Sequence, residues 1–258
     1  MKPELNLAAQ TRTRDALDLA PRFTDHDAQR LNRLFEGAST AEMLKSVIRD
    51  RLAGELTVVS SFGAESAVLL HLVASVDRSV PVLFLDTGKH FAETLAYRDE
   101  LVTLLGLDLV VLRPDPDDLA KRDETGLRWS YDPDGCCEIR KVKPLAKALA
   151  RFDASFTGRK AFQARTRANL PRFEVDTSDA QGRLKINPLI DWDASQIEGY
   201  FIQHDLPRHP LIAQGYPSIG CSPCTSQVLP GEDPRSGRWK GWDKTECGIH
   251  KPGLEPFL

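Results

Sequence analysis

Over much of the chain, segments with the hydrophobic pattern of a β-strand alternate with segments with the hydrophobic pattern of an α-helix. Short apolar runs, LTVVSSF at 56–62 and VPVLFLD at 80–86, have the length and composition of buried strands. Between and after them, AESAVLLHLVASV (64–76) and FAETLAYRDELVTLLG (91–106) repeat apolar residues at helical spacing, and Gly106 is placed to end the second helix. This order of elements predicts an α/β fold, in which a parallel sheet is flanked by helices.

The same patterns predict further elements on both sides of this unit. Residues 39–53 read as an amphipathic helix with a Ser/Thr cap and Glu42 near its third position. Residues 184–205 combine a short extended piece with a helix capped near Asp193. The remaining predictions are strands at 108–114 and 154–158 and a helix at 137–151, with Pro144 in its first turn or at a kink.

Three segments follow from these patterns. Residues 1–38 show no clear periodicity and are predicted to form a loosely docked N-terminal arm. Residues 39–230 form one α/β domain, and residues 231–258 form a flexible tail in which Pro, Gly and charged residues dominate. Ligands of such a sheet are expected beyond the carboxyl ends of its strands.

The composition of the chain argues against nucleic-acid and membrane partners. The chain has 258 residues, 41% of them hydrophobic, with a net charge of −3. This balance gives no support for a nucleic-acid partner, so a cationic site must be local. The first thirty residues lack the apolar region of a signal peptide, and no apolar run approaches membrane-spanning length. We therefore expect a cytoplasmic protein with no membrane association.

Five cysteines suggest metal or redox chemistry: Cys136, Cys137, Cys221, Cys224 and Cys247. A reducing compartment disfavours disulfides, and adjacent cysteines rarely pair with each other. Zinc knuckles use cysteines separated by intervening residues, which the adjacent pair lacks. Iron–sulfur clusters accept a wider range of spacings, so the first four cysteines favour a [4Fe–4S] cluster. Zinc and metal-free redox thiols remain as alternatives.

The fifth cysteine lies in KTECGIH, near the end of the chain. Lys244 and His250 supply positive charge near Cys247, and Gly248 supplies freedom of movement. An accessible, electropositive setting favours a reactive thiolate. The alternative is an incidental exposed cysteine.

Three segments at the ends of predicted strands are candidates for ligand binding, two of them for anions. The turn in VVSSFGAES (58–66) leads into a helix and can hold a phosphate, although an ordinary βα turn has the same pattern. LDTG (85–88) ends a strand whose backbone can contact a base. GRKAFQARTR (158–167) gathers four cations, which suit oxyanions or form a solvated basic face.

Taken together, these segments resemble one family, the assimilatory adenylyl-sulfate reductases of bacteria and plants. The resemblance runs from about residue 56 to 250 and rests, in order, on SSFGAES, LDTG, CCxxRK, GRK…TR, KxNPL, QGYPSIGCSPC, GEDPRSGRW and ECGIH. The first of these is also similar to the SGGxDS pyrophosphate loop of the adenine nucleotide α-hydrolase-like superfamily, with Phe62 and Glu65 as departures. Ala164 and Arg165 replace the serine–proline pair usual before the threonine–arginine, and Lys89 has no assigned role.

The resemblance implies a Rossmann-like nucleotide-binding domain and an oxidoreductase of sulfate assimilation and cysteine biosynthesis. The substrate would be adenosine 5′-phosphosulfate, and Cys247 would attack its sulfur, releasing AMP and leaving an S-sulfocysteine. Thioredoxin or glutaredoxin would then release sulfite, and a homo-oligomer is expected. Ser60, Ser61 and Gly63 would bind the nucleotide, and Leu85 the adenine. The expected cations of the substrate site are Lys141, Arg159, Arg167, Arg235, Arg238 and His250.

Three other functions compete with this one. The substrate could instead be 3′-phosphoadenylyl sulfate, alone or as one of two, but the four paired cysteines favour the unphosphorylated nucleotide. A tRNA-thiolating enzyme would need an intact SGGxDS loop and a basic surface, which Phe62, Glu65 and the net charge oppose. A non-enzymatic zinc or redox-sensing module would not require Cys247.

Overall fold

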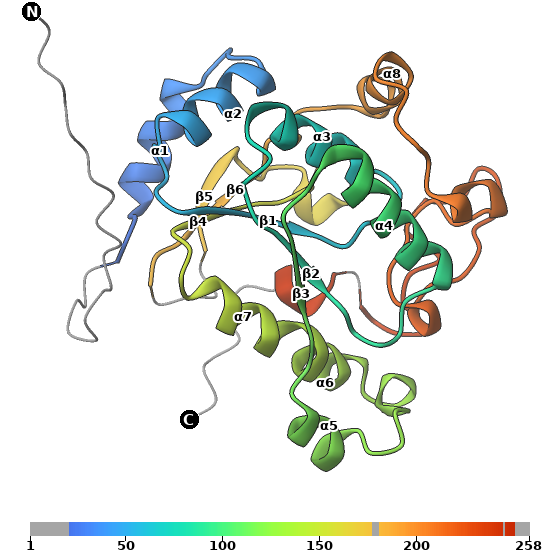
Figure 1. Cartoon of the computed structure of the whole chain (residues 1–258). Helices are drawn as coiled ribbons and strands as arrows, with labels where there is room; N and C mark the ends of the chain where they lie inside the picture. Colours follow the sequence, from blue (N-terminus) through green and yellow to red (C-terminus); the bar gives the residue numbers. More distant parts are fainter. Residues whose placement is uncertain (1–20, 177–180, 245, 251–258) are drawn as a thin grey trace, which may run out of the picture.

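A six-stranded sheet runs between two layers of helices (Figure 1). The structure is a computed structural model and describes residues 21–176, 181–244 and 246–250. The strand order is β3-β2-β1-β4-β6-β5, with every neighbouring pair parallel except β5 and β6. The strands are β1 Leu56–Ser60, β2 Val82–Leu85, β3 Leu109–Leu112, β4 Ala154–Phe156, β5 Phe173–Val175 and β6 Leu184–Ile186.

In Figure 1 the helices α1 to α4 lie above the sheet and α5 to α7 below it. Their ends follow the local sequence signals. Ser39 and Glu42 form a reciprocal capping box at the start of α2, and Asp193 forms one with Gln196 at the start of α8. Gly106 ends α4 in the left-handed conformation, with φ of 65°. The helices are α1 Asp25–Leu34, α2 Thr40–Arg49, α3 Ser66–Val76, α4 Ala92–Leu105, α5 Pro116–Arg122, α6 Pro133–Cys137, α7 Lys143–Leu149 and α8 Ala194–Gln203.

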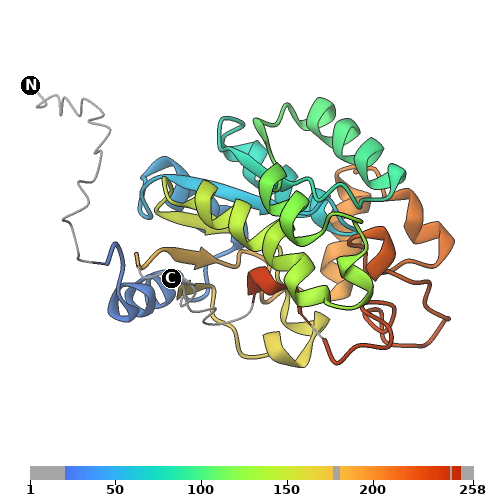
Figure 2. The ribbon, with the colours of Figure 1, turned by 90° about the horizontal axis from the view of Figure 1, so that it is seen from below.

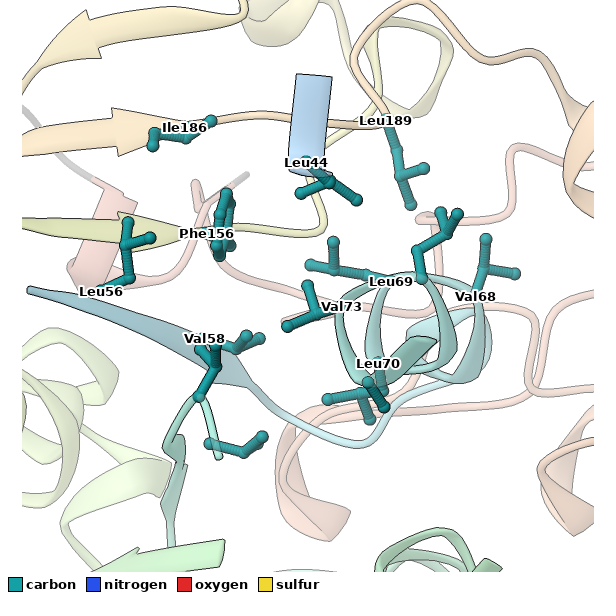
Figure 3. Packing of buried hydrophobic residues seen from close by; sticks show 14 of the residues in the cluster. Leu44, Leu56, Val58, Val68, Leu69, Leu70, Val73, Phe156, Ile186 and Leu189 are labelled. Carbon is teal, nitrogen blue, oxygen red and sulfur yellow. The ribbon is translucent and has the colours of Figure 1, made fainter. Parts of the chain in front are cut away.

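The main core lies on the upper face of the sheet (Figure 3). There α3 is buried along most of its length, because its apolar residues cover more than one side of the helix. Val73 of α3, Val58 of β1 and Phe156 of β4 belong to one cluster of buried side chains. A smaller cluster below the sheet joins Leu83 of β2 to Leu145 of α7. Both faces of the central strands are therefore buried, as a parallel sheet requires.

The sequence prediction of a helix-flanked, mostly parallel sheet is confirmed, with three differences. The strand β5 was not predicted, and it runs antiparallel to β6. In place of the single helix predicted at 137–151, the structure has three successive elements. These are the end of α6, a π-helical turn at Glu138–Val142, and then α7. The described part of the predicted N-terminal arm is not loosely docked, since α1 buries Leu31 against β5. Residues 1–20 lie outside the described residues.

The strand order determines where a ligand can bind. From β1 the chain continues through β2 to β3 on one side, and β4 lies on the other side of β1. A crevice therefore opens at the carboxyl ends of β1 and β4, where the connections diverge. No helix among the described residues is long and apolar enough to cross a membrane.

His209 makes the stability of the fold depend on pH. It is 1% exposed, its Nδ1 accepts a hydrogen bond from the Leu211 backbone N–H, and its Nε2 lies 3.0 Å from Thr94 Oγ1. Burial lowers the pKa of His209 to about 4, against about 6.5 in the unfolded chain. The unfolded state therefore binds more protons between these values, and stability is lost as pH falls through this window.

We expect the free energy of unfolding to fall by roughly 3 kcal/mol from His209 as pH drops from about 6.5 to about 4. Urea unfolding at a series of pH values measures this dependence. His209→Gln should flatten it in this window, whereas His26→Gln, at an exposed position, should not. Equal slopes in the parent protein and His209→Gln would contradict the prediction.

Candidate active site

A cavity of about 1520 Å³ opens at the carboxyl ends of β1 and β4. It extends from the loop after β1 to the C-terminal tail, which lies beside the π-helical turn Glu138–Val142 between α6 and α7 (the red segment in Figure 2). The structure thus brings together segments that are nearly two hundred residues apart in sequence. The predicted site residues that line it are Ser60, Ser61, Gly63, Leu85, Lys141, Arg159, Arg167, Arg235, Arg238 and Cys247. The side chain of His250 lies outside the described residues.

The loop between β1 and α3 has the geometry of an anion site. Phe62 takes a left-handed conformation with φ of 49°, which is rare for a bulky residue, and its ring packs edge-on against Phe84. In the SGGxDS pattern that the sequence resembles, this position is a glycine, which adopts such a φ without strain. The cap position of α3, Glu65, makes no side-chain hydrogen bond to the helix N-terminus. The Ser66 N–H donates to the Gly63 carbonyl at 3.1 Å, so the amides of the first turn that can serve an anion are those of Ala67 and Val68.

The turn after β2 lies beside this loop. Leu85 lines the cavity at the end of β2, and its carbonyl oxygen lies 2.9 Å from His90 Nε2. Thr87 is buried, and its Oγ1 lies 3.4 Å from Cys221 Sγ. The LDTG turn therefore joins this side of the large cavity to the paired cysteines.

Two cations of the segment GRKAFQARTR form ion pairs with carboxylates of the protein. Arg159 donates from Nε to Asn187 Oδ1 at 3.0 Å and forms an ion pair with Glu174. Lys160 is 2% exposed, and its Nζ lies 2.8 Å from Glu65 Oε2. Glu65, which replaces the superfamily aspartate, thus neutralises a buried lysine. Local sequence patterns gave no signal for this pair, because the two residues lie in distant segments of the chain.

The tail thiol lies in a cationic part of the cavity. Cys247 is 9% exposed and packs against Cys137 and Trp239. A hydrogen bond from the Cys137 thiol and the positive fields of Lys141 and Arg238 hold the pKa of Cys247 well below the usual thiol value, against the opposing effect of burial. Arg238 stacks on Trp239 at 4.5 Å and passes close to Gly220, where a Cβ atom would collide with its guanidinium.

The four paired cysteines converge on a second, smaller cavity. Cys136 and Cys137 end α6, and the π-helical turn after them leaves both side chains buried, a local feature often found at functional sites. Cys221 and Cys224 flank a 3-10 turn that docks on the LDTG turn through the Ser222 N–H and the Lys89 carbonyl, at 2.8 Å. Burial raises the pKa of Cys136 to about 11.

The donor chemistry of this cavity fits an iron–sulfur cluster. In the described part of the chain, no group of three or more His, Cys, Asp or Glu side chains is arranged to hold a metal ion. The four thiols nevertheless line one cavity, and among the described residues that line it there is no carboxylate or imidazole. Four cations surround it and suit an anionic cluster: Lys89, Arg140, Lys141 and Arg238. The assignment remains a proposal, developed below.

Arg140, which lines the cysteine cavity, forms a buried ion pair with Asp123. Arg140 donates from Nη2 to Asp123 Oδ2 at 2.6 Å and from Nη1 to the Thr87 carbonyl at 2.7 Å. The side chain of Asp123 is fully buried, and its other oxygen accepts the backbone N–H of Arg128 at 2.8 Å. The motif CCxxRK therefore supplies a structural arginine as well as two thiols.

Comparisons with known proteins agree with this fold and site. An adenosine 5′-phosphosulfate reductase from Mesorhizobium japonicum is 52% identical over 229 residues, which cover 88% of this chain and 89% of the relative. A protein of the same name from a Chelativorans species is 54% identical over 219 residues, covering 84% and 88%.

Solved structures agree as well. The crystal structure of a phosphoadenylyl-sulfate reductase from Candida auris, a phosphate complex, has a TM-score of 0.67 at 26% identity, covering 80% of this chain and 98% of that one. An FMN adenylyltransferase from Candida glabrata in complex with ATP has a TM-score of 0.50 at 17% identity, covering 86% and 83%, which shows a shared fold alone.

The fold and the cavity define a Rossmann-like α/β protein, as the sequence predicted. The phosphoadenosine phosphosulfate reductase domain family matches residues 55–227. The chain belongs to this family. The resemblance that the motifs indicated is therefore confirmed, and with it the prediction that the chain is an enzyme.

Proposed function

We propose that this chain reduces adenosine 5′-phosphosulfate to sulfite and AMP, with Cys247 as the nucleophile. The observation that carries the proposal is the position of Cys247 inside the cavity at the carboxyl ends of β1 and β4, beside Lys141 and Arg238. A thiol at this place can reach a nucleotide held by the loop Ser60–Ser66. The names of the relatives support the same substrate.

The two ends of the substrate need different groups. The phosphate suits the uncapped amides at the start of α3, and the end of β2 at Leu85 suits the adenine. The sulfate suits Lys141 and Arg238, which also face the thiol. Both cations would offset the repulsion between a thiolate and an anion and stabilise the charge that develops on the sulfonate oxygens.

In the first step, the Cys247 thiolate attacks the sulfate sulfur. An S–S bond forms, the bond between sulfur and the bridging oxygen breaks, and AMP leaves with the electron pair. The product is an S-sulfocysteine at Cys247. If Cys137 is bound to iron, it has no proton to donate to Cys247. Lys141 and Arg238 therefore stabilise the Cys247 thiolate whether or not Cys137 holds iron.

In the second step, a thiolate of thioredoxin or glutaredoxin attacks Cys247 Sγ, and sulfite leaves with the electron pair. A second thiol then releases Cys247 from the mixed disulfide. The reductant is oxidised to a disulfide, and its two electrons account for the reduction of sulfate sulfur to sulfite. The tail carrying Cys247 must move to meet this partner, since the thiol is buried here. Cytoplasmic location and homo-oligomeric assembly remain predictions.

A [4Fe–4S] cluster held by Cys136, Cys137, Cys221 and Cys224 completes the proposal. When bound, it would supply a fixed structure and an electrostatic field; it need not supply electrons, because thiols do. Lys141 connects the two parts of the site, since it lines both cavities.

Steady-state kinetics with both nucleotides test the substrate. We expect kcat/KM for adenosine 5′-phosphosulfate to exceed that for the 3′-phosphorylated nucleotide by about tenfold or more, which corresponds to ~1.4 kcal/mol of transition-state binding. Comparable values would indicate dual specificity, and the reverse order would make the chain a phosphoadenylyl-sulfate reductase. Absence of sulfite from either nucleotide would refute the reductase proposal.

A further inference from the structure

The residue directly before the nucleophile is bound to two arginines of the cavity. Glu246 accepts a bidentate pair of hydrogen bonds from Arg167, Nε to Oε1 and Nη2 to Oε2, both at 2.7 Å. Arg235 Nη2 donates to the same Oε2 at 3.2 Å. The side chains of Arg167 and Glu246 are 9% and 12% exposed. A bidentate, largely buried contact of this kind is strong and fixes direction as well as distance.

This contact continues to the phosphate loop. The remaining terminal nitrogen of Arg167, Nη1, donates to Gln163 Oε1 at 2.8 Å. Gln163 Nε2 donates to Glu65 Oε2 at 2.7 Å, and Glu65 also holds the buried Lys160. An unbroken chain of polar contacts therefore runs from the start of α3 to the residue before Cys247. Because each member is fixed by its neighbour, the position of the tail depends on the loop that is expected to hold the nucleotide.

The cations of the cavity fall into two pairs with different partners. Lys141 and Arg238 act on Cys247. Arg167 and Arg235 act on Glu246. Glu246 takes Nε and one terminal nitrogen of Arg167 and one terminal nitrogen of Arg235, so its negative charge offsets the two cations that would otherwise suit a second anion.

We propose that Glu246 is a positioning residue that latches the tail, with Arg167 and Arg235 as its docking partners rather than as ligands of the nucleotide. The latch presents Cys247 to Lys141 and Arg238 for the first step and must open before a thiol partner can reach it. The inference rests on the proposed function for the reaction itself, but the latch can be measured without any turnover.

The direct measurement is the rate at which iodoacetamide alkylates Cys247 in the resting protein, read by peptide mapping. Since the thiol is buried while the tail is docked, alkylation requires opening. Glu246→Gln keeps the size of the side chain and removes its charge. We expect it to raise the alkylation rate about 10- to 100-fold. Asp243→Asn, at an exposed position of the same tail, is the matched control and should leave the rate unchanged.

A double-mutant cycle separates the latch from a role in nucleotide binding. With a latch, Arg167→Gln raises alkylation about as much as Glu246→Gln, and the double variant is no faster than either. Single-turnover formation of S-sulfocysteine slows in all three, while the affinity for AMP stays within about twofold of the parent. If Arg167 instead binds substrate and Glu246 competes for it, Arg167→Gln weakens AMP binding and Glu246→Gln lowers KM.

The outcomes also distinguish this inference from the proposed function. Unchanged alkylation in Glu246→Gln, in a parent protein that does release sulfite, would overturn the latch and leave the function intact. Faster alkylation in a protein that turns over neither nucleotide would support the latch and refute the reductase proposal.

Discussion

Replacing Cys247 by serine is expected to abolish sulfite release while nucleotide binding remains close to that of the parent protein. A serine hydroxyl is not ionised near neutral pH, and it cannot form the S–S bond on which release of AMP and then of sulfite depends. Removing a nucleophile of this kind typically costs on the order of 10⁴-fold or more in turnover. The loop Ser60–Ser66 and Leu85, which are proposed to hold the phosphate and the adenine, remain in place, so the affinity for AMP should change little.

Sulfite assays with reduced thioredoxin and equilibrium binding of AMP measure the two halves of this prediction. Mass spectrometry after a single turnover should detect S-sulfocysteine in the parent protein, on the peptide that contains Cys247, and not in Cys247→Ser. Asp243→Asn, in the same segment, should retain the activity of the parent. Sulfite release by Cys247→Ser at a rate near that of the parent would exclude Cys247 as the nucleophile and favour a module in which this thiol has no role.

Local signals were sufficient to predict most of the sheet and the helices on it. The apolar run ending at Leu85 is buried on both faces, and Gly106 ends α4 as its lack of a Cβ predicts. Ser39 with Glu42 and Asp193 with Gln196 are short-range pairs, so the sequence contains all the information that their caps need. The turn after β1 was also recognisable as a connection from a strand to a helix, but the sequence pattern alone did not distinguish an anion site from an ordinary βα turn.

What the sequence did not reveal depends on contacts between distant residues. The helix α1 has only a short amphipathic pattern, and its place beside β5 is set by packing with residues such as Phe173, about 140 positions away. In the site, Glu246 had no local signal at all, since its two arginines lie in other segments. Arg167 and Arg235 were predicted as substrate cations and both line the cavity, but their partner Glu246 could not be identified from spacing.

Replacing Cys221 or Cys136 by serine is expected to remove the metal from the protein. The parent, purified without oxygen, should contain about four iron atoms and as many labile sulfides per chain, with the broad visible absorbance of a cluster. Each variant deletes one of four thiols that line a single cavity, one from each half of the ligand set. A hydroxyl is a poor ligand for iron at neutral pH, so iron and sulfide should fall to background and the absorbance should disappear.

Two control variants make this result specific to the cluster. Cys247→Ser removes a thiol that packs against Cys137 but is not in the proposed ligand set, so it should keep all of its iron. Lys141→Met keeps every thiol and should also keep its iron, but it should turn over more slowly, because Lys141 faces both cavities. One zinc ion per chain in place of iron would establish the mononuclear alternative. Metal-free protein with full activity would show that the four thiols do not act as ligands, and Lys141→Met with normal iron and normal turnover would separate the cysteine cavity from the chemistry at Cys247.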